Sequence, residues 1–283
     1  MKKKILFLFA ILLFFVACSK YDKDKLTKER YVVTSPEIAE LIYLIGAEKN
    51  VVGVTVECDY PNYYKKIKKV GNFGNVSIEK VIALKPTVVF TTKLEQDKLN
   101  DTLKKLDINV VAFYPHKIED LIDSIVKIGK ITHREKRAGF VADSLLSELS
   151  KIKEKNQKIK DKPKVYVEIY NNPVMSASND SFLGQLISYA GGRNIFEKLP
   201  RDYSQVNQEE IIKKNPDVII CLVPNETKER IAQRKGWTKI SAVKTGKIYT
   251  TKEINPDLVL RAGSRVVVGI KKLKKLIYNE QNN

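Results

Sequence analysis

The sequence predicts an α/β protein of two similar lobes, and three observations carry this prediction. Strands rich in β-branched residues alternate with helical segments, which favours parallel sheets with helices on both faces. Residues 76–90 and 206–220 are similar although they lie 130 positions apart, so the repeated unit is a whole lobe. One long helical stretch separates the two halves. Because clefts between lobes commonly bind ligands, we expect a ligand cleft there.

The repeat matches residue by residue. The segment VSIEKVIALKPTVVF corresponds to VNQEEIIKKNPDVII, and each predicts a short helix, a proline and a buried strand. An aromatic residue also repeats three positions before each segment. The corresponding pairs include Val76 and Val206, Glu79 and Glu209, Pro86 and Pro216, and Phe73 and Tyr203.

Residues 1–17 are typical of an export signal. Lys2–Lys4 form a basic start, and the apolar run that follows is too short to span a bilayer. The run ends at Ala17 and resembles a lipoprotein signal, in which Cys18 becomes the lipidated first residue. An ordinary secretory signal cut near the same place is the alternative. We therefore expect an exported protein, lipid-anchored at the cell membrane and facing the periplasm or cell exterior, with residues 18–29 as a flexible tether.

Charge restricts the partners. The formal net charge is +18, and removal of the three signal lysines leaves it strongly positive. The lysines are interleaved with acids on helical faces, which is typical of a solvated surface. Export and the absence of a basic, aromatic-rich module argue against nucleic acid, whereas attraction to anionic lipid or an anionic ligand remains open.

The N-terminal lobe is predicted over residues 30–133. Ser35-Pro36 is typical of the first turn of a helix, which we expect over 37–44. Ser77 begins a second helix, and Pro86 ends it. The remaining predicted elements are strands over 30–34, 51–56, 88–92 and 110–113, a helix over 96–106, and a long loop over 57–75.

A single stiff helix is predicted over residues 134–160. Its apolar residues recur at spacings of three and four, which predicts one buried stripe. At 1.5 Å per residue, a continuous helix over residues 134–159 is roughly 39 Å long, enough to carry the chain from one lobe to the other. The stripe consists of Ala138, Val141, Ala142, Leu145, Leu149 and Ile152.

The C-terminal lobe is predicted over residues 161–283. A β-branched run predicts its first strand over 164–169, and Gly191-Gly192 ends a helix over 181–190. We therefore predict two Rossmann-like lobes with parallel sheets, joined by one long rigid helix. The other predicted elements are a loop over 170–180, the repeated helix and strand over 206–222, a short helix at Trp237 and Ile240, a strand over 247–251 and a closing helix over 261–278.

Local motifs of the mature chain can be compared with known families. They are GVT…DYP at 53–61, SIEKVIALKPTVV at 77–89, YAGGRNIF at 189–196, VNQEEIIKKNPDVII at 206–220 and RAGSRVVVGI at 261–270. Together they resemble the iron-siderophore and cobalamin (haem) family of periplasmic substrate-binding proteins of ABC importers, over residues 30–278. The resemblance implies capture of a metal chelate and delivery to a permease dimer with its ATPase. It also implies lobes that close little, because a rigid helix joins them.

Glu79 and Glu209 are the predicted docking residues. The resemblance implies that one acid on each lobe contacts arginines of the permease dimer. Charge complementarity of this kind fixes orientation and encounter rate. The alternative is that acids near a helix start interact only with the helix dipole and the cap.

Aromatic and neighbouring residues form the predicted wall of the cleft. Flat ligands such as a corrin, a porphyrin or catecholate rings can stack favourably on the flat aromatic side chains of Tyr60, Phe73 and Tyr203. The alternative is that these rings attach loops to the core. Tyr60 is also a candidate oxygen donor to haem iron. The resemblance places Glu57 and Thr92 where cobalamin-binding relatives have aromatic residues, which argues against cobalamin.

Polar side chains complete the predicted ligand site. Arg201 and Arg261 are suited to bidentate contacts with an anionic chelate, although Arg261 has the alternative of bracing the loop before the final helix. The resemblance matches Asp257 with an acid that contacts corrin amides. Further polar candidates around the cleft are Asp59, Lys93, Asn172 and Asn179.

Other function classes find little support. No G-x-S-x-G elbow, P-loop or G-x-G-x-x-G follows a predicted strand, so we predict no enzyme. His116 and His133 are the only histidines, too few for a site that binds a free metal ion. We expect no intrinsic cofactor, and a bound iron chelate, corrinoid or haem. Among these ligands we rank a ferric siderophore first, cobalamin second and haem third. The alternative to a transport function is a sensor or adhesion subunit on the same fold.

Cys58 and Cys221 are the cysteines that remain beside Cys18. Export permits a disulfide between them. Such a bridge would cross the predicted cleft, so we expect two free or buried thiols instead.

Overall fold

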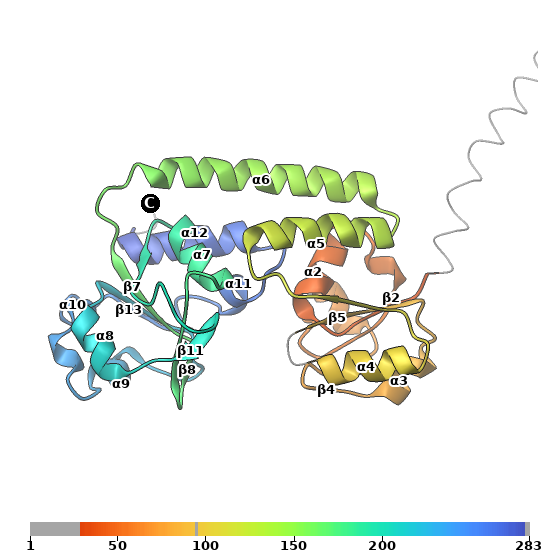
Figure 1. Cartoon of the computed structure of the whole chain (residues 1–283), viewed down its shortest axis with the longest axis horizontal. Coiled ribbons are helices and arrows are strands. Elements are labelled where there is room, and N and C mark those ends of the chain that lie inside the picture. Colours follow the sequence, from red (N-terminus) through yellow and green to blue (C-terminus); the bar gives the residue numbers. More distant parts are fainter. Residues whose placement is uncertain (1–28, 94–95, 281–283) are drawn as a thin grey trace, which may run out of the picture. The chain divides into compact units, whose positions relative to one another are not determined.

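The structure is a computed structural model that describes residues 29–93 and 96–280 (Figure 1). The predicted signal peptide and the lipidation site at Cys18 lie outside the described residues. In the described ranges, no helix is both long and apolar enough to cross a membrane. The chain divides into two compact units between Phe113 and Tyr114, here called unit 1 and unit 2. The predicted lobe boundaries and the spanning role of the helix at 134–160 stay predictions.

Unit 1 is built on a parallel sheet of four strands in the order β2-β1-β5-β6. Val32 and Val89 are fully buried in this sheet and pack with Val81 and Leu103 from neighbouring helices. Continuous burial of this kind is typical of parallel strands covered on both faces. The strands are β1 (Tyr31–Val33), β2 (Val51–Val54), β5 (Val88–Thr92) and β6 (Val110–Phe113).

The helices of unit 1 begin and end close to the predicted positions. The Ser77 hydroxyl accepts a hydrogen bond from the Lys80 N–H, so it caps the following helix as predicted. Ser35 occupies the corresponding position before Pro36, but its side chain makes no capping bond and its hydroxyl is buried. The helices are α2 (Pro36–Leu44), α3 (Ile78–Ala83) and α4 (Asp97–Lys105), with the 3-10 turn η1 (Glu48–Asn50).

The segment predicted as a loop over 57–75 contains short elements of its own. A 3-10 turn, η2 (Asn62–Lys66), is followed by an antiparallel hairpin of β3 (Gly71–Asn72) and β4 (Asn75–Val76). Gly71 has φ +140°, and a Cβ there would lie 2.3 Å from the Asn75 carbonyl oxygen. The close approach of the two hairpin strands therefore requires glycine.

The main sheet of unit 2 has the same arrangement as that of unit 1. Its strands are parallel in the order β10-β7-β12-β13, so the first, second, third and fourth strands along the chain occupy equivalent places in both sheets. Tyr166 and Trp237 belong to its buried core, with ring centroids 6.0 Å apart. The strands are β7 (Lys164–Glu168), β10 (Arg193–Asn194), β12 (Val218–Cys221) and β13 (Ile248–Tyr249). The prediction of two similar α/β folding units is confirmed.

Unit 2 also contains a small antiparallel sheet in the order β11-β9-β8. The sequence prediction of a loop over 170–180 is therefore wrong. The segment is polar and without clear alternation, and its central strand forms because a later segment pairs with it, as Tyr203 does with Ala177. The strands are β8 (Tyr170–Asn171), β9 (Val174–Ala177) and β11 (Tyr203–Gln205).

Helices α5 (Ile118–Ile131) and α6 (Glu135–Gln157) form an antiparallel pair in unit 2 (Figure 1). The chain turns between them at His133, which has φ +56°. A Cβ on Gly129 would lie 2.3 Å from the Ala138 side chain, so the close packing of α5 on α6 requires glycine at this position. The predicted stripe of α6 is largely buried at Ala138, Val141, Ala142 and Leu149.

The remaining helices of unit 2 surround its main sheet. The Ser181 hydroxyl caps one of them by accepting from the Gly184 N–H. The predicted closing helix over 261–278 begins at Val266, five residues later than predicted, and a separate short helix precedes Arg261. The helices are α7 (Phe182–Tyr189), α8 (Gln208–Lys214), α9 (Lys228–Ala232), α10 (Ser241–Lys244), α11 (Asp257–Leu260) and α12 (Val266–Tyr278), with the 3-10 turn η3 (Trp237–Lys239).

The sequence repeat has a backbone counterpart. Lys85 and Asn215, which occupy equivalent positions, both have left-handed backbone angles, with φ +47° and +46°. Each directly precedes the repeated proline, which cannot continue the helix. The repeat therefore specifies the same helix end in both units.

Candidate functional site

The predicted residues of unit 1 lie in segments that follow the carboxyl ends of its strands, where open α/β sheets bind ligands. The Glu57 carboxylate accepts a hydrogen bond from the Phe73 backbone N–H at 2.9 Å. The Phe73 carbonyl accepts from the Gln96 amide Nε2, also at 2.9 Å. Glu57 and Gln96 therefore hold the β3–β4 hairpin by its backbone, and they leave the half-buried Phe73 ring available for contacts.

Gln96 connects several strand ends, a role that the sequence analysis missed. It is 2 % exposed, and its Oε1 accepts from the Thr34 hydroxyl at 2.7 Å and from the Thr92 N–H at 3.3 Å. Thr92 is fully buried, and its carbonyl accepts from the Asn100 amide. The structure thus places Thr92 in a buried polar network. The sequence feature that could have indicated this role of Gln96 is its place at the start of a helix just after a strand.

The loop that carries Tyr60 is fixed by a lysine. The Lys69 ammonium donates to the carbonyl oxygens of Tyr64 at 3.0 Å, Thr55 at 3.4 Å and Cys58 at 3.5 Å. Three acceptors satisfy the three donors of an ammonium group. Tyr60, 45 % exposed, therefore lies on an ordered loop.

A hollow of about 270 Å³ lies beside Phe73. It is bordered by the β3–β4 hairpin and by Gln96, Lys98 and Leu99 at the start of α4. Its size suits one aromatic ring or a small polar group, rather than a whole macrocycle.

In unit 2, Tyr203 lies on β11 with its hydroxyl directed to the start of α7. The hydroxyl interacts with the Ser181 side chain and with the Leu183 backbone. Burial, together with the nearby Tyr114 and Asp202, raises the pKa of Tyr203 well above its ordinary value. The phenol is therefore neutral and attached to the helix terminus by its hydroxyl, while the ring remains half-buried.

The two predicted arginines have different surroundings. The Arg261 guanidinium lies 3.1 Å from the Asp257 carboxylate, one helical turn earlier, so these two predicted residues lie together. This ion pair supports the bracing alternative for Arg261. Arg201 is exposed, and its backbone exchanges hydrogen bonds with Ser204. The further candidates Asp59, Lys93, Asn172 and Asn179 are exposed.

Glu79 and Glu209 are exposed in the first turns of α3 and α8. The Glu79 carboxylate accepts from its own N–H and from the Ser77 hydroxyl, and these bonds lower its pKa. The Asn207 side chain caps α8 by accepting from the Glu209 N–H at 2.8 Å. Each unit therefore presents one acid beside a capped helix start.

Comparison with protein families decides the identity. Residues 32–254, most of the chain, match the model of the periplasmic binding proteins. The chain belongs to the periplasmic binding protein family. The predicted resemblance and the predicted fold class are confirmed.

Known relatives of this periplasmic binding protein are substrate-binding proteins of transporters. The ABC transporter substrate-binding lipoprotein YvrC of Bacillus subtilis is 32 % identical over 88 % of the chain and 80 % of its own length. The high-affinity heme uptake system protein IsdE of Staphylococcus aureus is 29 % identical over 69 % of each protein. A crystal structure of a possible iron-binding (periplasmic solute-binding) protein from Staphylococcus epidermidis has a TM-score of 0.77 and 29 % identity, covering 88 % of this chain and 98 % of its own.

The described ranges of this periplasmic binding protein contain no group of three or more His, Cys, Asp or Glu residues suited to a free metal ion. Two polar clusters of unit 2 were nevertheless missed by the sequence analysis. In the first, His116 Nδ1 lies 2.6 Å from Asp202 Oδ2, and the Tyr114 ring packs edge-on against the imidazole with centroids 4.1 Å apart. No sequence signal connects residues 86 positions apart.

The second missed cluster is a buried ion pair at the carboxyl end of β7. The Arg234 guanidinium binds both oxygens of Glu168, at 2.5 and 2.7 Å, and Glu168 is 1 % exposed. The Tyr166 hydroxyl donates to the same carboxylate at 2.9 Å. Arg234 also lies 4.7 Å from the Trp237 ring centroid. Both carboxylate oxygens of Glu168 already accept hydrogen bonds from protein side chains, which indicates a structural role.

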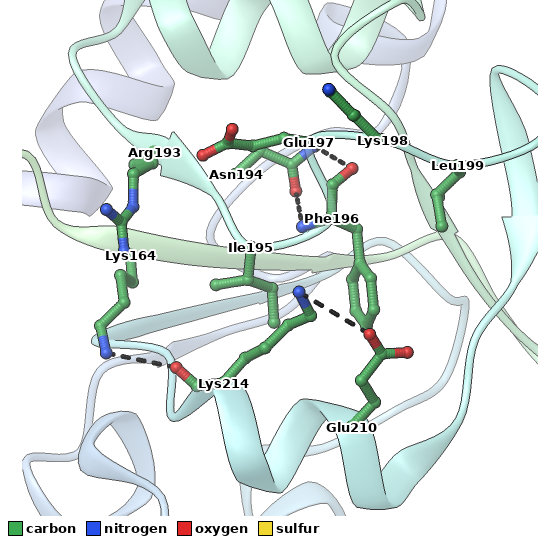
Figure 2. A pocket seen from close by; sticks show the side chains of 10 residues that line it. All are labelled: Lys164, Arg193, Asn194, Ile195, Phe196, Glu197, Lys198, Leu199, Glu210 and Lys214. Atoms are coloured by element: carbon green, nitrogen blue, oxygen red, sulfur yellow. Dashed lines mark hydrogen bonds and ion pairs between the residues drawn. The ribbon is translucent and has the colours of Figure 1, made fainter.

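A hollow of about 630 Å³ lies elsewhere in unit 2 (Figure 2). Figure 2 shows Lys164 reaching the carbonyl of Lys214 at the end of α8, while the Lys214 ammonium lies near the Glu210 carboxylate. None of the predicted ligand residues lines it, and Lys164 and Arg193 begin their strands. The hollow therefore lies toward the amino ends of the strands, away from the usual ligand edge of such sheets.

Proposed function

We propose that this periplasmic binding protein captures a bulky metal chelate outside the cell and delivers it to the permease of an ABC importer. The observation that carries the proposal is the similarity, over most of the chain, to proteins named for ABC transport, haem uptake and iron binding. The chelate is cargo, and the protein itself has no intrinsic cofactor.

The proposed partners follow from this role. A permease dimer with its ATPase would receive the loaded protein, with Glu79 and Glu209 as the docking acids. Lipidation at Cys18 would hold the protein at the membrane, near the importer. Two acids on equivalent capped helices suit a two-fold receptor, because one arginine contact can form with each unit.

Ligand binding is assigned to loop and strand-end residues of both units. In unit 1 they are Glu57, Tyr60, Phe73 and Thr92, and in unit 2 they are Arg201, Tyr203, Asp257 and Arg261. The main candidates for the ligand are a ferric siderophore and cobalamin. Haem is the alternative ligand, and the similarity to IsdE supports it.

The test is ligand-dependent thermal stability of residues 19–283. Hemin, hydroxocobalamin and a panel of ferric siderophores are each added well above micromolar concentration. A ligand that binds only the folded protein raises the melting temperature, by an amount set by the ratio of its concentration to Kd. A rise of several degrees with one class identifies the cargo, and no rise with any of them would contradict chelate capture.

A further inference from the structure

We infer that His116 binds the metal centre of the cargo through its Nε2 atom, with Asp202 orienting the imidazole. This inference rests on the proposed function and narrows it. It predicts a planar macrocyclic chelate with an accessible axial position, such as haem or a corrinoid.

The hydrogen bond to Asp202 defines the tautomer of the ring. An ionised carboxylate only accepts hydrogen bonds, so at 2.6 Å the Nδ1 atom is the donor. In the neutral ring, Nε2 then carries the lone pair. Histidines that bind metals commonly donate their other ring nitrogen to a carboxylate, which fixes the ring and raises its basicity. The pair of His116 and Asp202 has this arrangement.

Both partners are held by their backbones. The His116 N–H donates to the Asp120 carboxylate at 3.0 Å, and that carboxylate also accepts from the Lys117 N–H at the start of α5. The Asp202 carbonyl accepts from the Ser178 N–H at 2.8 Å. The imidazole therefore belongs to a fixed framework rather than to a free loop.

The ring is also accessible. The His116 side chain is 49 % exposed, whereas Asp202 is 24 % exposed. Tyr114 packs edge-on against the ring, so an aromatic side chain accompanies the imidazole. An aromatic setting around one nitrogen donor suits a flat metal chelate better than a hydrated ion.

The chemistry of the metal separates the cargo classes. Haem iron takes a protein ligand on the axis perpendicular to the macrocycle, and histidine is one of its usual ligands. A siderophore that surrounds ferric iron with its own oxygen donors leaves no position for an imidazole. A direct bond from His116 therefore selects the macrocycle.

The test is titration of the mature chain with hemin, followed by the Soret and visible bands. Relative to wild type, His116→Ala is expected to change the band positions and to weaken binding at least tenfold. Asp202→Asn, which removes the negative charge but keeps the shape, is expected to weaken binding about tenfold or more, in the range found for partners of metal-binding histidines. His133→Ala, which removes the other histidine, is the matched control and should behave as wild type.

A rescue experiment separates ligation from structure. Imidazole added to His116→Gly should restore the wild-type bands, which a purely structural role would not allow. Unchanged bands in His116→Ala would overturn the inference. Binding of ferric siderophores alone would overturn it and leave chelate capture intact, whereas binding of no chelate would overturn both.

Discussion

The carboxylate of Glu57 accepts the backbone N–H of Phe73 at 2.9 Å, across 16 positions of sequence. This bond joins the segment after β2 to the β3–β4 hairpin. Gln96 donates to the Phe73 carbonyl, so both the N–H and the C=O of Phe73 are held by side chains. These two bonds fix the position of the Phe73 ring. Glu57 therefore shapes the proposed ligand surface even without touching a ligand.

Substitution of Glu57 tests this positioning role. Glu57→Ala should lower the free energy of unfolding by about 1.5 kcal/mol, because a hydrogen bond to a charged acceptor is lost. Chelate affinity should fall with it, as measured by thermal shift and by titration. Glu57→Gln keeps an acceptor oxygen and should retain most of the stability. If Glu57→Gln loses affinity while it keeps stability, Glu57 contacts the ligand directly.

The buried pair of Glu168 and Arg234 should contribute strongly to stability. Glu168→Gln leaves a guanidinium without its bidentate partner, and we expect a loss of about 3 kcal/mol in chemical denaturation. The exposed pair of Lys271 and Glu148, 2.6 Å apart, is the control. Lys271→Ala should change stability by less than about 1 kcal/mol. Equal losses in the two variants would contradict the structural role of Glu168.

Lys85 occupies a backbone conformation that favours glycine or asparagine. Lys85→Asn should raise the free energy of unfolding by ~0.5 kcal/mol, since asparagine tolerates left-handed angles better than lysine. The equivalent exchange in unit 2, Asn215→Lys, should destabilise by about 1 kcal/mol or more. It also removes the acceptor of the Ser241 N–H at 2.7 Å. Melting temperatures that move in the same direction for both variants would refute this reading.

The two thiols should be unreactive in the folded protein. Burial raises the pKa of Cys58 and of Cys221 from 9.0 to about 12. Both should therefore resist iodoacetamide at pH 8 until the protein unfolds, because the thiolate is the nucleophile. Mass spectrometry of the alkylated chain measures this directly.

The same pKa shifts predict a pH dependence. Above pH 9 the unfolded chain releases thiol protons that the folded chain retains, so the free energy of unfolding should fall between pH 9 and about 12. Cys58→Ala should show a shallower fall over this range, because one of the shifted groups is removed. Parallel curves for the two proteins would exclude a contribution from Cys58.

Charge reversal of the docking acids should separate transport from binding. Glu79→Lys and Glu209→Lys should each reduce uptake in cells that carry the importer, and the double variant should reduce it most. Chelate affinity in solution should stay at the wild-type value. Glu210→Lys is the control, because it changes the neighbouring acid on the same helix. Wild-type uptake by the double variant would exclude docking through these acids.

Much of the fold was predictable because local signals specified it. The strands at 88–92 and 110–113 are short β-branched runs, and the structure forms them with the predicted ends. Ser77 and Ser181 cap helices through bonds that span only a few residues. The proline after each repeated helix ends it regardless of the rest of the chain.

The site was predictable only as a set of segments. Phe73 and Tyr203 are equivalent in the repeat, yet their surroundings differ. The Phe73 backbone is held by Glu57 and Gln96, whereas the Tyr203 hydroxyl is directed to the start of α7. The surroundings of Phe73 and Tyr203 differ because side chains from different segments of the chain pack around each of them.

By itself, the sequence determined the two similar α/β units, the shared helix ends and the family, because these follow from periodicity, caps and a repeat that are written along the chain. The tertiary structure decided which distant residues meet. It pairs β11 with β9, joins His116 to Asp202 and encloses Glu168 with Arg234. Residues tens of positions apart have no local signal in common, and only the packing of whole segments around a shared core brings them within hydrogen-bonding distance.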